Sequence, residues 1–281
     1  IAKKIQHSAL PSVFPPYPNR KDFSIFASMD AAKEVGGDFY DFYLLDENHL
    51  AFVVADVSGK GIPGAMFMMT SKTLIKSHAE SGLAVNDVFT QVNAQLCENN
   101  EAGMFVTAWM GILDLETGLI RYANAGHNPP VVRHKDGSYE YLKGRANFVL
   151  AGMEGVRYKE QQLQLQQGDE IYLYTDGVTE AHNVDKQLFG EDRLLVSLNE
   201  TAGMTVDEIC KKVKADVDAF QGEAEQFDDI TMLCVRLSEV ENKMLSVNPT
   251  METVPQVAAF VEEHLEKFEV PMKLTMKLMV A

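Results

Sequence analysis

Apolar and polar residues alternate along residues 23–28, "FSIFAS", where Phe23, Ile25 and Ala27 fall on one side of an extended chain. A longer apolar run, "HLAFVVADVSG", follows and ends on Asp56. A period of two is typical of a half-buried strand, and a short continuous apolar run is typical of a fully buried one. The pattern therefore predicts two strands in the first part of the chain.

A helical period appears in three longer segments. Apolar residues recur every three or four positions over residues 62–79, 85–97 and 206–220. Pro63 is compatible with the first of these because it lies in the first turn. Residues 1–10 form a shorter amphipathic stretch before "PSVFPPYP", which no helix can cross. We expect three long helices and, at the start, the end of a connector helix.

The remaining apolar segments are short and separated by turn residues. "MFVTAWMGILDLETGLIRYANAG" predicts two strands about "ETG", "VVRHKDGSYEYL" two about "KDG", and "QLQLQQGDEIYLYTDG" two about "QGD". A final apolar run over residues 230–237 predicts a closing strand. Grouped helices and consecutive hairpins are typical of an α+β fold with antiparallel sheets, and they differ from the strict alternation of a parallel α/β fold.

Composition and charge narrow the class of protein. The 281 residues are 46% hydrophobic, which is typical of a globular chain, and the net charge of -16 disfavours nucleic acid as a partner. The sequence has no long apolar run and no secretory leader, so we expect a cytoplasmic location, although the full-length protein could be tethered to a membrane sensor. The chain starts at Ile1 and stops at Ala281 within a helical pattern, which we interpret as a fragment of a longer polypeptide.

The pattern of cysteines argues against a metal-binding or catalytic role for them. Cys97, Cys210 and Cys234 are an odd number without C-x-x-C spacing, and each lies in or beside an apolar segment. This pattern predicts reduced structural thiols and excludes a cysteine zinc site. A cysteine nucleophile is disfavoured as well, because no His or Arg cluster flanks them.

Acidic residues next to glycine, or next to a second acid, mark the ends of several apolar segments. They occur in "EVGGDFYD" (Asp38, Asp41), "FVVADVSGKG" (Asp56), "IYLYTDGVTE" (Asp176, Glu180) and "FDDIT" (Asp228, Asp229). Each one alone fits an ordinary turn aspartate. Together they predict a site, because the ends of strands converge at an edge of a sheet and glycine permits close backbone approach.

The chemistry of such a site follows from its oxygen ligands. Carboxylates are almost never buried unpaired, so Asp228 and Asp229, which directly precede an apolar strand, call for a cation. A set of ligands made of aspartates, with no Cys and no paired His, is typical of a site for Mg2+ or Mn2+. Two such ions roughly 3.5–4 Å apart can activate a water molecule for attack on a phosphoryl group.

The motifs "GGDFYD", "DVSGKGIPGAM", "MFVTAWMGILDLETGLIRYANAGHNPP", "GDEIYLYTDGVTEA" and "DDITM" occur in this order and closely resemble the SpoIIE/RsbU-type branch of the PP2C-like (PPM) metal-dependent serine phosphatases, which regulate sigma factors. The resemblance implies an α-β-β-α sandwich of two antiparallel β-sheets flanked by helices over residues 21–238. Residues 1–20 would then be a connector helix and a proline-rich linker.

The resemblance also implies roles for individual residues. Asp56 would bridge two metal ions, with the Val57 carbonyl and Asp38 on the first ion. Asp176 and Asp228 would bind the second ion, and Asp229 a further, weaker one. The residues implied in catalysis are Asp38, Asp56, Asp176 and Asp228.

Two further residues attract attention. Relatives often carry His where this chain has Lys60, and Lys60 either holds the substrate phosphate as a point charge or is simply solvated. His127, in "NAGHNPP", is a candidate general acid, but its Asn, Gly and Pro neighbours favour a structural role in a rigid turn.

The implied activity is that of a metal-dependent protein serine/threonine phosphatase. It would use Mn2+ or Mg2+, as two ions with a possible third, and two-metal-activated water attack. The expected substrate is a phosphorylated STAS-domain anti-sigma-factor antagonist. Two other interpretations stay open: a catalytically silent signalling module that binds a partner, and a phosphohydrolase for small molecules.

The two ends of the chain suggest further partners. Residues 243–281 resemble the start of a GHKL-type ATPase domain of anti-sigma-factor kinases, and they stop before the segment that would bind ATP. Residues 1–10 are too short to be a stable helix alone, so we expect a partner surface: either the same helix in a homodimer or the helix of this chain that carries Met66 to Met69. An upstream sensor domain would complete the protein.

Overall fold

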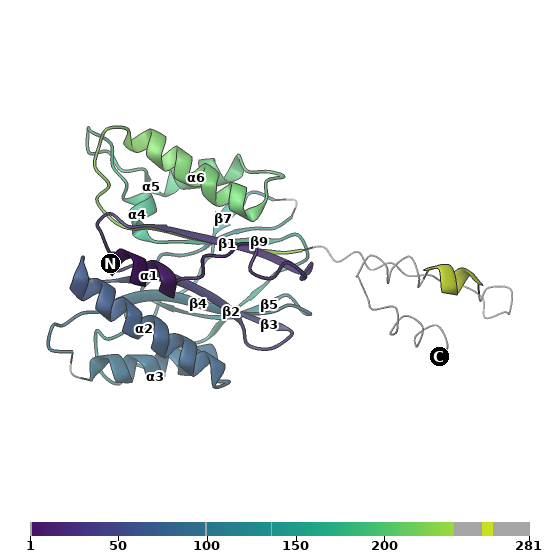
Figure 1. Cartoon of the computed structure of the whole chain (residues 1–281), viewed down its shortest axis with the longest axis horizontal. Coiled ribbons are helices and arrows are strands. Elements are labelled where there is room, and N and C mark those ends of the chain that lie inside the picture. Colours follow the sequence, from purple (N-terminus) through teal and green to yellow (C-terminus); the bar gives the residue numbers. More distant parts are fainter. Residues whose placement is uncertain (1, 99, 136, 239–254, 261–281) are drawn as a thin grey trace. The chain divides into compact units, whose positions relative to one another are not determined.

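The computed structural model describes residues 2–98, 100–135, 137–238 and 255–260, in two compact units, Ile1–Glu239 and Val240–Ala281 (Figure 1). In the second unit, residues 255–260 are helical. The rest of the expected ATPase-like segment, 243–281, lies outside the described residues. The first unit contains the sheets and the long helices.

Two five-stranded sheets form the centre of this unit, and all neighbouring strands are antiparallel. The first sheet has the order β1 (Phe23–Asp30), β10 (Ile230–Leu237), β9 (Glu170–Tyr174), β6 (Val131–Arg133) and β7 (Tyr139–Tyr141). The second has the order β2 (Phe39–Leu44), β3 (His49–Val57), β4 (Val106–Asp114), β5 (Leu119–Ala125) and β8 (Gln161–Gln164).

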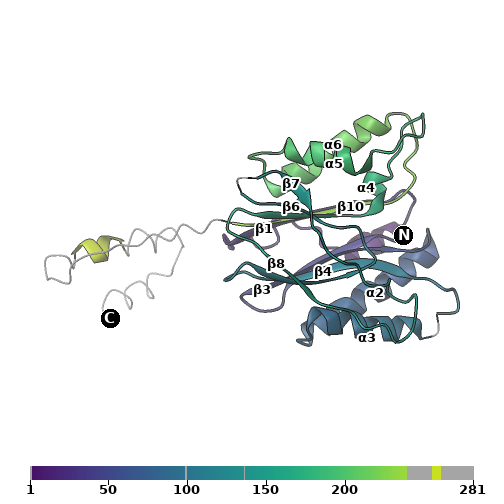
Figure 2. The ribbon, with the colours of Figure 1, turned by 180° about the vertical axis from the view of Figure 1, so that it is seen from behind.

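Helices cover both outer faces of the two sheets (Figures 1 and 2). The first sheet is covered by α5 (Gly190–Asn199) and α6 (Val206–Gln221), and the second by α2 (Ile62–Glu80) and α3 (Val85–Cys97). Two shorter helices, α1 (Ala2–Ala9) and α4 (Asp176–Thr179), contact α2 and β10 respectively. The arrangement is the expected α-β-β-α sandwich.

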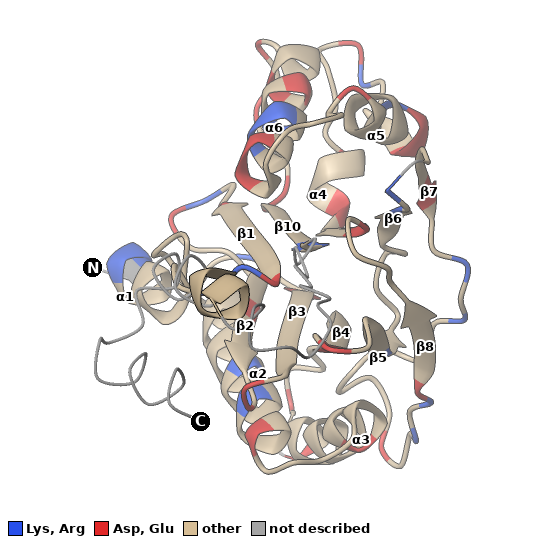
Figure 3. Ribbon diagram, turned by 90° about the vertical axis from the view of Figure 1, so that its right-hand side faces the viewer, with Lys and Arg blue, Asp and Glu red and all other residues tan. Residues whose placement is uncertain are grey.

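The core explains why these segments fold as they do. Phe52, Trp109 and Tyr122 lie on three adjacent strands, with ring centroids 5.6 Å apart for Phe52 and Trp109 and 5.0 Å apart for Trp109 and Tyr122. Burying one such side chain contributes about 1.5–3 kcal/mol. A second core lies between the first sheet and α6, which buries one apolar stripe there. The solvent face of α6 carries acidic and basic residues in ion pairs (Figure 3).

Most of the predicted elements are present, and α3 and β10 have the predicted bounds. The predicted hairpin about "QGD" is wrong, because β8 pairs with β5 in the second sheet while β9 pairs with β10 and β6 in the first. A turn sequence indicates a reversal of the chain but not which sheet receives the next strand. The strand β2 and the helix α5 were not predicted; β2 is buried almost throughout and shows no alternation.

None of the helices in the described part of the chain combines the length and the apolar character needed to cross a membrane.

Candidate metal centre

The predicted acidic residues lie at the ends of strands from both sheets. Asp38 directly precedes β2, Asp56 lies near the end of β3, and Asp176 follows β9 at the start of α4. Asp228 and Asp229 directly precede β10. In both ribbon views α4 lies at the end of the sandwich that also carries α1 (Figures 1 and 2). Strands from both sheets thus deliver carboxylates to one end of the fold.

Asp38 is the most enclosed of these residues. Its side chain is 1% exposed, and its Oδ2 accepts a hydrogen bond of 2.6 Å from the Thr175 hydroxyl. Burial raises the pKa of Asp38 well above its usual range, and the nearby charges of Asp56 and Asp229 raise it further. The carboxylate is therefore positioned by a neutral hydroxyl while it faces two other acids.

The pKa shifts of the other carboxylates show that they also face one another. Burial raises the pKa of Asp56 to about 7, and the charges of Asp176, Asp228 and Asp229 add to this effect. Burial, followed by the charges of Glu180 and Asp228, raises the pKa of Asp176 to about 6. Negative charge is concentrated here beyond what the surrounding protein neutralises.

Asp229 holds the loop that carries Asp38. Its Oδ1 accepts a hydrogen bond from the backbone N–H of Ala32 at 2.8 Å, and its Oδ2 accepts one from Gly37 at 2.8 Å. A Cβ atom at Gly36 would lie 2.1 Å from Asp229 Oδ2, so only glycine permits the loop to wrap the carboxylate so closely. Asp229 thus anchors the loop in addition to any role towards a metal ion.

Asp228 has a cationic partner in the structure. The Lys60 ammonium lies 2.8 Å from Asp228 Oδ2 and donates a hydrogen bond of 2.8 Å to the Phe227 carbonyl. The same ammonium lies 4.1 Å from the centroid of the Phe227 ring. Lys60 is therefore paired with Asp228 while its side chain stays 37% exposed, and its contact with a substrate phosphate stays a prediction.

The donors present fit a hard divalent ion. They are carboxylate oxygens, which hard divalent ions prefer. The Val57 carbonyl lies beside Gly37, where an added Cβ would approach it to 2.8 Å, and its role as a ligand stays a prediction. Among the described residues, no three His, Cys, Asp or Glu side chains are arranged as a ready-made cage for one ion. Mg2+ is compatible with this, because it keeps several waters and needs only one or two protein carboxylates.

A family model, Stage II sporulation protein E (SpoIIE), matches residues 46–238. The chain belongs to the SpoIIE family. Protein IcfG of Synechocystis is 31% identical over 261 aligned residues, which cover 83% of this chain and 40% of IcfG. Phosphoserine phosphatase RsbU of Bacillus subtilis is 29% identical over 237 residues, which cover 84% of this chain and 69% of RsbU. The chain thus spans less than half the length of IcfG.

Solved structures agree on the fold of this SpoIIE-family chain. The SiaA-PP2C domain of Pseudomonas aeruginosa superposes with a TM-score of 0.73 at 24% sequence identity, over 84% of this chain and 94% of that domain. The α-β-β-α sandwich is therefore a PP2C fold, as expected.

One acid of the sequence motifs lies apart from the centre. Asp41 in β2 forms a 2.6 Å ion pair with Lys72 of α2, and both side chains are largely buried. It therefore fastens α2 to the second sheet of this SpoIIE-family domain and already has its own cation.

Two residues that hold the site were not predicted from the sequence. Thr175 positions Asp38, as described above. Gln6 in α1 forms two hydrogen bonds with the backbone of Gly36: its Nε2 donates to the Gly36 carbonyl at 2.7 Å, and its Oε1 accepts from the Gly36 N–H at 3.0 Å. The available signal was a polar residue within a short amphipathic helix, but its partner lies 30 residues away.

His127 has the contacts of a structural residue. Its Nε2 lies 3.1 Å from the Tyr174 carbonyl and its Nδ1 lies 2.9 Å from the Thr107 hydroxyl. A carbonyl only accepts, so Nε2 carries the proton and Nδ1 accepts from Thr107. Burial lowers the pKa of His127 to about 4. The neutral ring joins β4 of the second sheet to β9 of the first.

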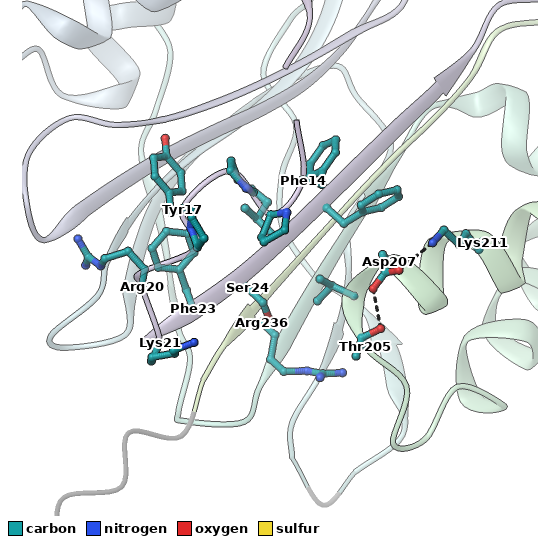
Figure 4. A pocket seen from close by; sticks show the side chains of 16 residues that line it. Phe14, Tyr17, Arg20, Lys21, Phe23, Ser24, Thr205, Asp207, Lys211 and Arg236 are labelled. Atoms are coloured by element: carbon teal, nitrogen blue, oxygen red, sulfur yellow. Dashed lines mark hydrogen bonds and ion pairs between the residues drawn. The ribbon is translucent and has the colours of Figure 1, made fainter. Parts of the chain in front are cut away.

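A cavity of about 510 Å³ lies elsewhere, between the proline-rich segment, β1 and the start of α6 (Figure 4). Phe14, Tyr17 and Phe23 line one part of it, and Asp207 and Lys211 line another. None of the clustered aspartates lines it, so this cavity is separate from the candidate metal centre.

Proposed function

We propose that residues 21–238 form a metal-dependent protein serine/threonine phosphatase. The observation that carries the proposal is the gathering of carboxylates at one end of the sandwich, where burial first, and the charges of neighbouring acids second, raise the pKa values of Asp56 and Asp176. Such a concentration of charge is stable in its ionised form only when cations enter.

The roles proposed for the residues are those that the family resemblance implies. Asp56 would bridge two ions, with Asp38 and the Val57 carbonyl on the first, and Asp176 and Asp228 on the second. When bound, such ions lower the pKa of water and neutralise phosphoryl oxygens. Thr175 orients the Asp38 carboxylate, and Asp229 fixes the loop before it while it remains a proposed ligand of a weaker, third ion.

Mn2+ or Mg2+ is the proposed cofactor. The oxygen donors of this chain favour these ions, and RsbX, which shares the fold, has been solved in complex with magnesium.

The substrate we propose is a phosphorylated STAS-domain anti-sigma-factor antagonist. Two relatives, RsbU and RsbP of Bacillus subtilis, are named phosphoserine phosphatases. Lys60 lies at the rim, with its side chain 37% exposed, within reach of a phosphate that enters from solvent. The loops around Lys60 and Phe227 are open to solvent, which suits a protein substrate.

We also propose that residues 1–20 connect this domain to a sensor and support a homodimer. The support is the position of α1: Gln6 is buried against Gly36, and Ile5 is 58% exposed.

Phosphate release from a phosphoserine-bearing STAS-domain protein tests the proposed function. The full chain should turn over in Mn2+ or Mg2+, stop in excess EDTA, and recover when metal is restored. Undiminished release in EDTA contradicts the metal mechanism. Binding of metal and phosphoprotein without release would identify a silent module, and release from free phosphoserine but not from the phosphoprotein would identify a small-molecule phosphohydrolase.

A further inference from the structure

Lys60 occupies a loop whose backbone directs it towards the start of β10. It lies between Gly59 and Gly61, which have positive φ values of 113° and 76°, on the short connection from β3 to α2. Glycine adopts such angles without strain, so the turn is tight. The turn lets the Lys60 side chain reach residues 167 positions away in the sequence.

The close contacts of the Lys60 ammonium converge on Phe227 and Asp228. It forms an ion pair of 2.8 Å with Asp228, a hydrogen bond of 2.8 Å to the Phe227 carbonyl, and a cation–π contact at 4.1 Å with the Phe227 ring. The ring of His182 packs edge-on against Phe227, with centroids 6.0 Å apart. The ammonium is therefore held in one place by several partners.

The position of the Lys60 ammonium beside Asp228 conflicts with metal binding at that carboxylate. A divalent ion binds a carboxylate oxygen at about 2.0–2.1 Å, so an ion on Asp228 would lie within a few ångströms of the ammonium and repel it. The geometry points to Lys60 as an internal counter-ion of Asp228, which an entering metal ion must displace. This inference rests on the proposed metal centre and adds to it a mechanism that sets its metal affinity.

Displacement would have two consequences. In the metal-free protein, Lys60 neutralises part of the acidic cluster and keeps Phe227 and Asp228 together. After metal binding, the ammonium is released at the rim beside the ions, where a substrate phosphate arrives. One lysine thus weakens metal binding and then becomes available to the anionic substrate.

Direct measurement of Mn2+ affinity by calorimetry tests this without enzyme turnover. In Lys60→Met the dissociation constant should fall about three- to fivefold, because the competitor for Asp228 is gone and a partly exposed ion pair is worth up to about 1 kcal/mol. Lys60→Arg should stay near wild type. Lys33→Met is the matched control: it removes an equal charge from the loop before Asp38, and its affinity should change less than about twofold.

A second measurement follows Lys60 itself. In the wild-type chain labelled with 15N-lysine, the ammonium signal of Lys60 should shift during a Mg2+ titration with the midpoint of metal binding. An unmoved signal at saturating Mg2+ overturns the counter-ion proposal, as does an unchanged or weaker affinity in Lys60→Met. If the wild-type chain binds neither ion, the proposed metal centre fails as well, so the two failures are distinguishable.

Discussion

The strand β9 has an acidic site at each end, and the two sites are neutralised in different ways. At its start, Glu170 is completely buried and contacts Arg133, Arg236 and the Tyr139 hydroxyl. Beyond its end, Asp176 faces other carboxylates, with Lys60 as a nearby cation. The same strand therefore carries one acid with two arginines and a hydroxyl as internal partners, and another that faces two acids and a single lysine.

The difference separates structural charge from functional charge. A buried ion costs several kcal/mol unless cations and hydrogen bonds surround it, and the site of Glu170 supplies both. The cluster around Asp56 has Lys60 beside several acids, and burial first, with the charges of neighbouring acids second, raises the pKa values of Asp56 and Asp176. A site with more acids than internal cations is suited to bind further cations from solution, whereas a site with a full set of internal cations is not.

The largest effect is expected at Glu170. Glu170→Gln leaves Arg133 and Arg236 without their shared carboxylate, so the free energy of unfolding should fall by about 3–5 kcal/mol. Urea denaturation measures this. Mn2+ affinity of the folded variant should be unchanged. Glu80→Gln, which breaks an exposed pair with Lys76, serves as the control and should cost less than about 1 kcal/mol. A loss that small at Glu170 would remove the contrast between the two sites.

Asp56→Asn should change activity without loss of stability. An amide cannot bridge two cations, so kcat should fall at least about a hundredfold, or about 2.7 kcal/mol. The metal-free variant should be as stable as the wild type or more stable, because the charge that Asp176 and Asp228 oppose is removed. Steady-state kinetics at saturating metal and urea denaturation in EDTA give the two values. Near-normal kcat would show that Asp56 is not the bridging ligand.

Local patterns made much of this molecule predictable. The apolar runs of β3 and β10 and the periodicity of α3 follow from short-range spacing, and the acidic motifs indicated the site through family resemblance. The contacts that set its geometry join distant segments. The Lys60–Phe227 hydrogen bond spans 167 residues, and that from Gly37 to Asp229 spans 192. Packing of the two sheets creates these pairs, so no local pattern contains them.

His127 extends the comparison, because it is a buried titratable group whose ring forms hydrogen bonds with neutral partners. The Thr107 hydroxyl and the Tyr174 carbonyl hold its ring, and burial lowers its pKa from 6.5 to about 4. A base with a lowered pKa binds fewer protons in the folded state than in the unfolded state. Its contribution to stability is therefore complete above about pH 6.5, declines as the pH falls towards 4, and is constant below that value.

The expected loss from His127 at pH 5 is roughly 2 kcal/mol relative to pH 8, by proton linkage between these pKa values. His127→Gln keeps a donor for Tyr174 and an acceptor for Thr107 but does not titrate. Urea denaturation of both proteins from pH 4 to 8 isolates the difference, because the carboxylates titrate in each. The two stability curves should diverge below pH 6.5, with the variant less sensitive to acid. Parallel curves would mean that the buried ring already accepts a proton in the folded state and is not held neutral by its partners.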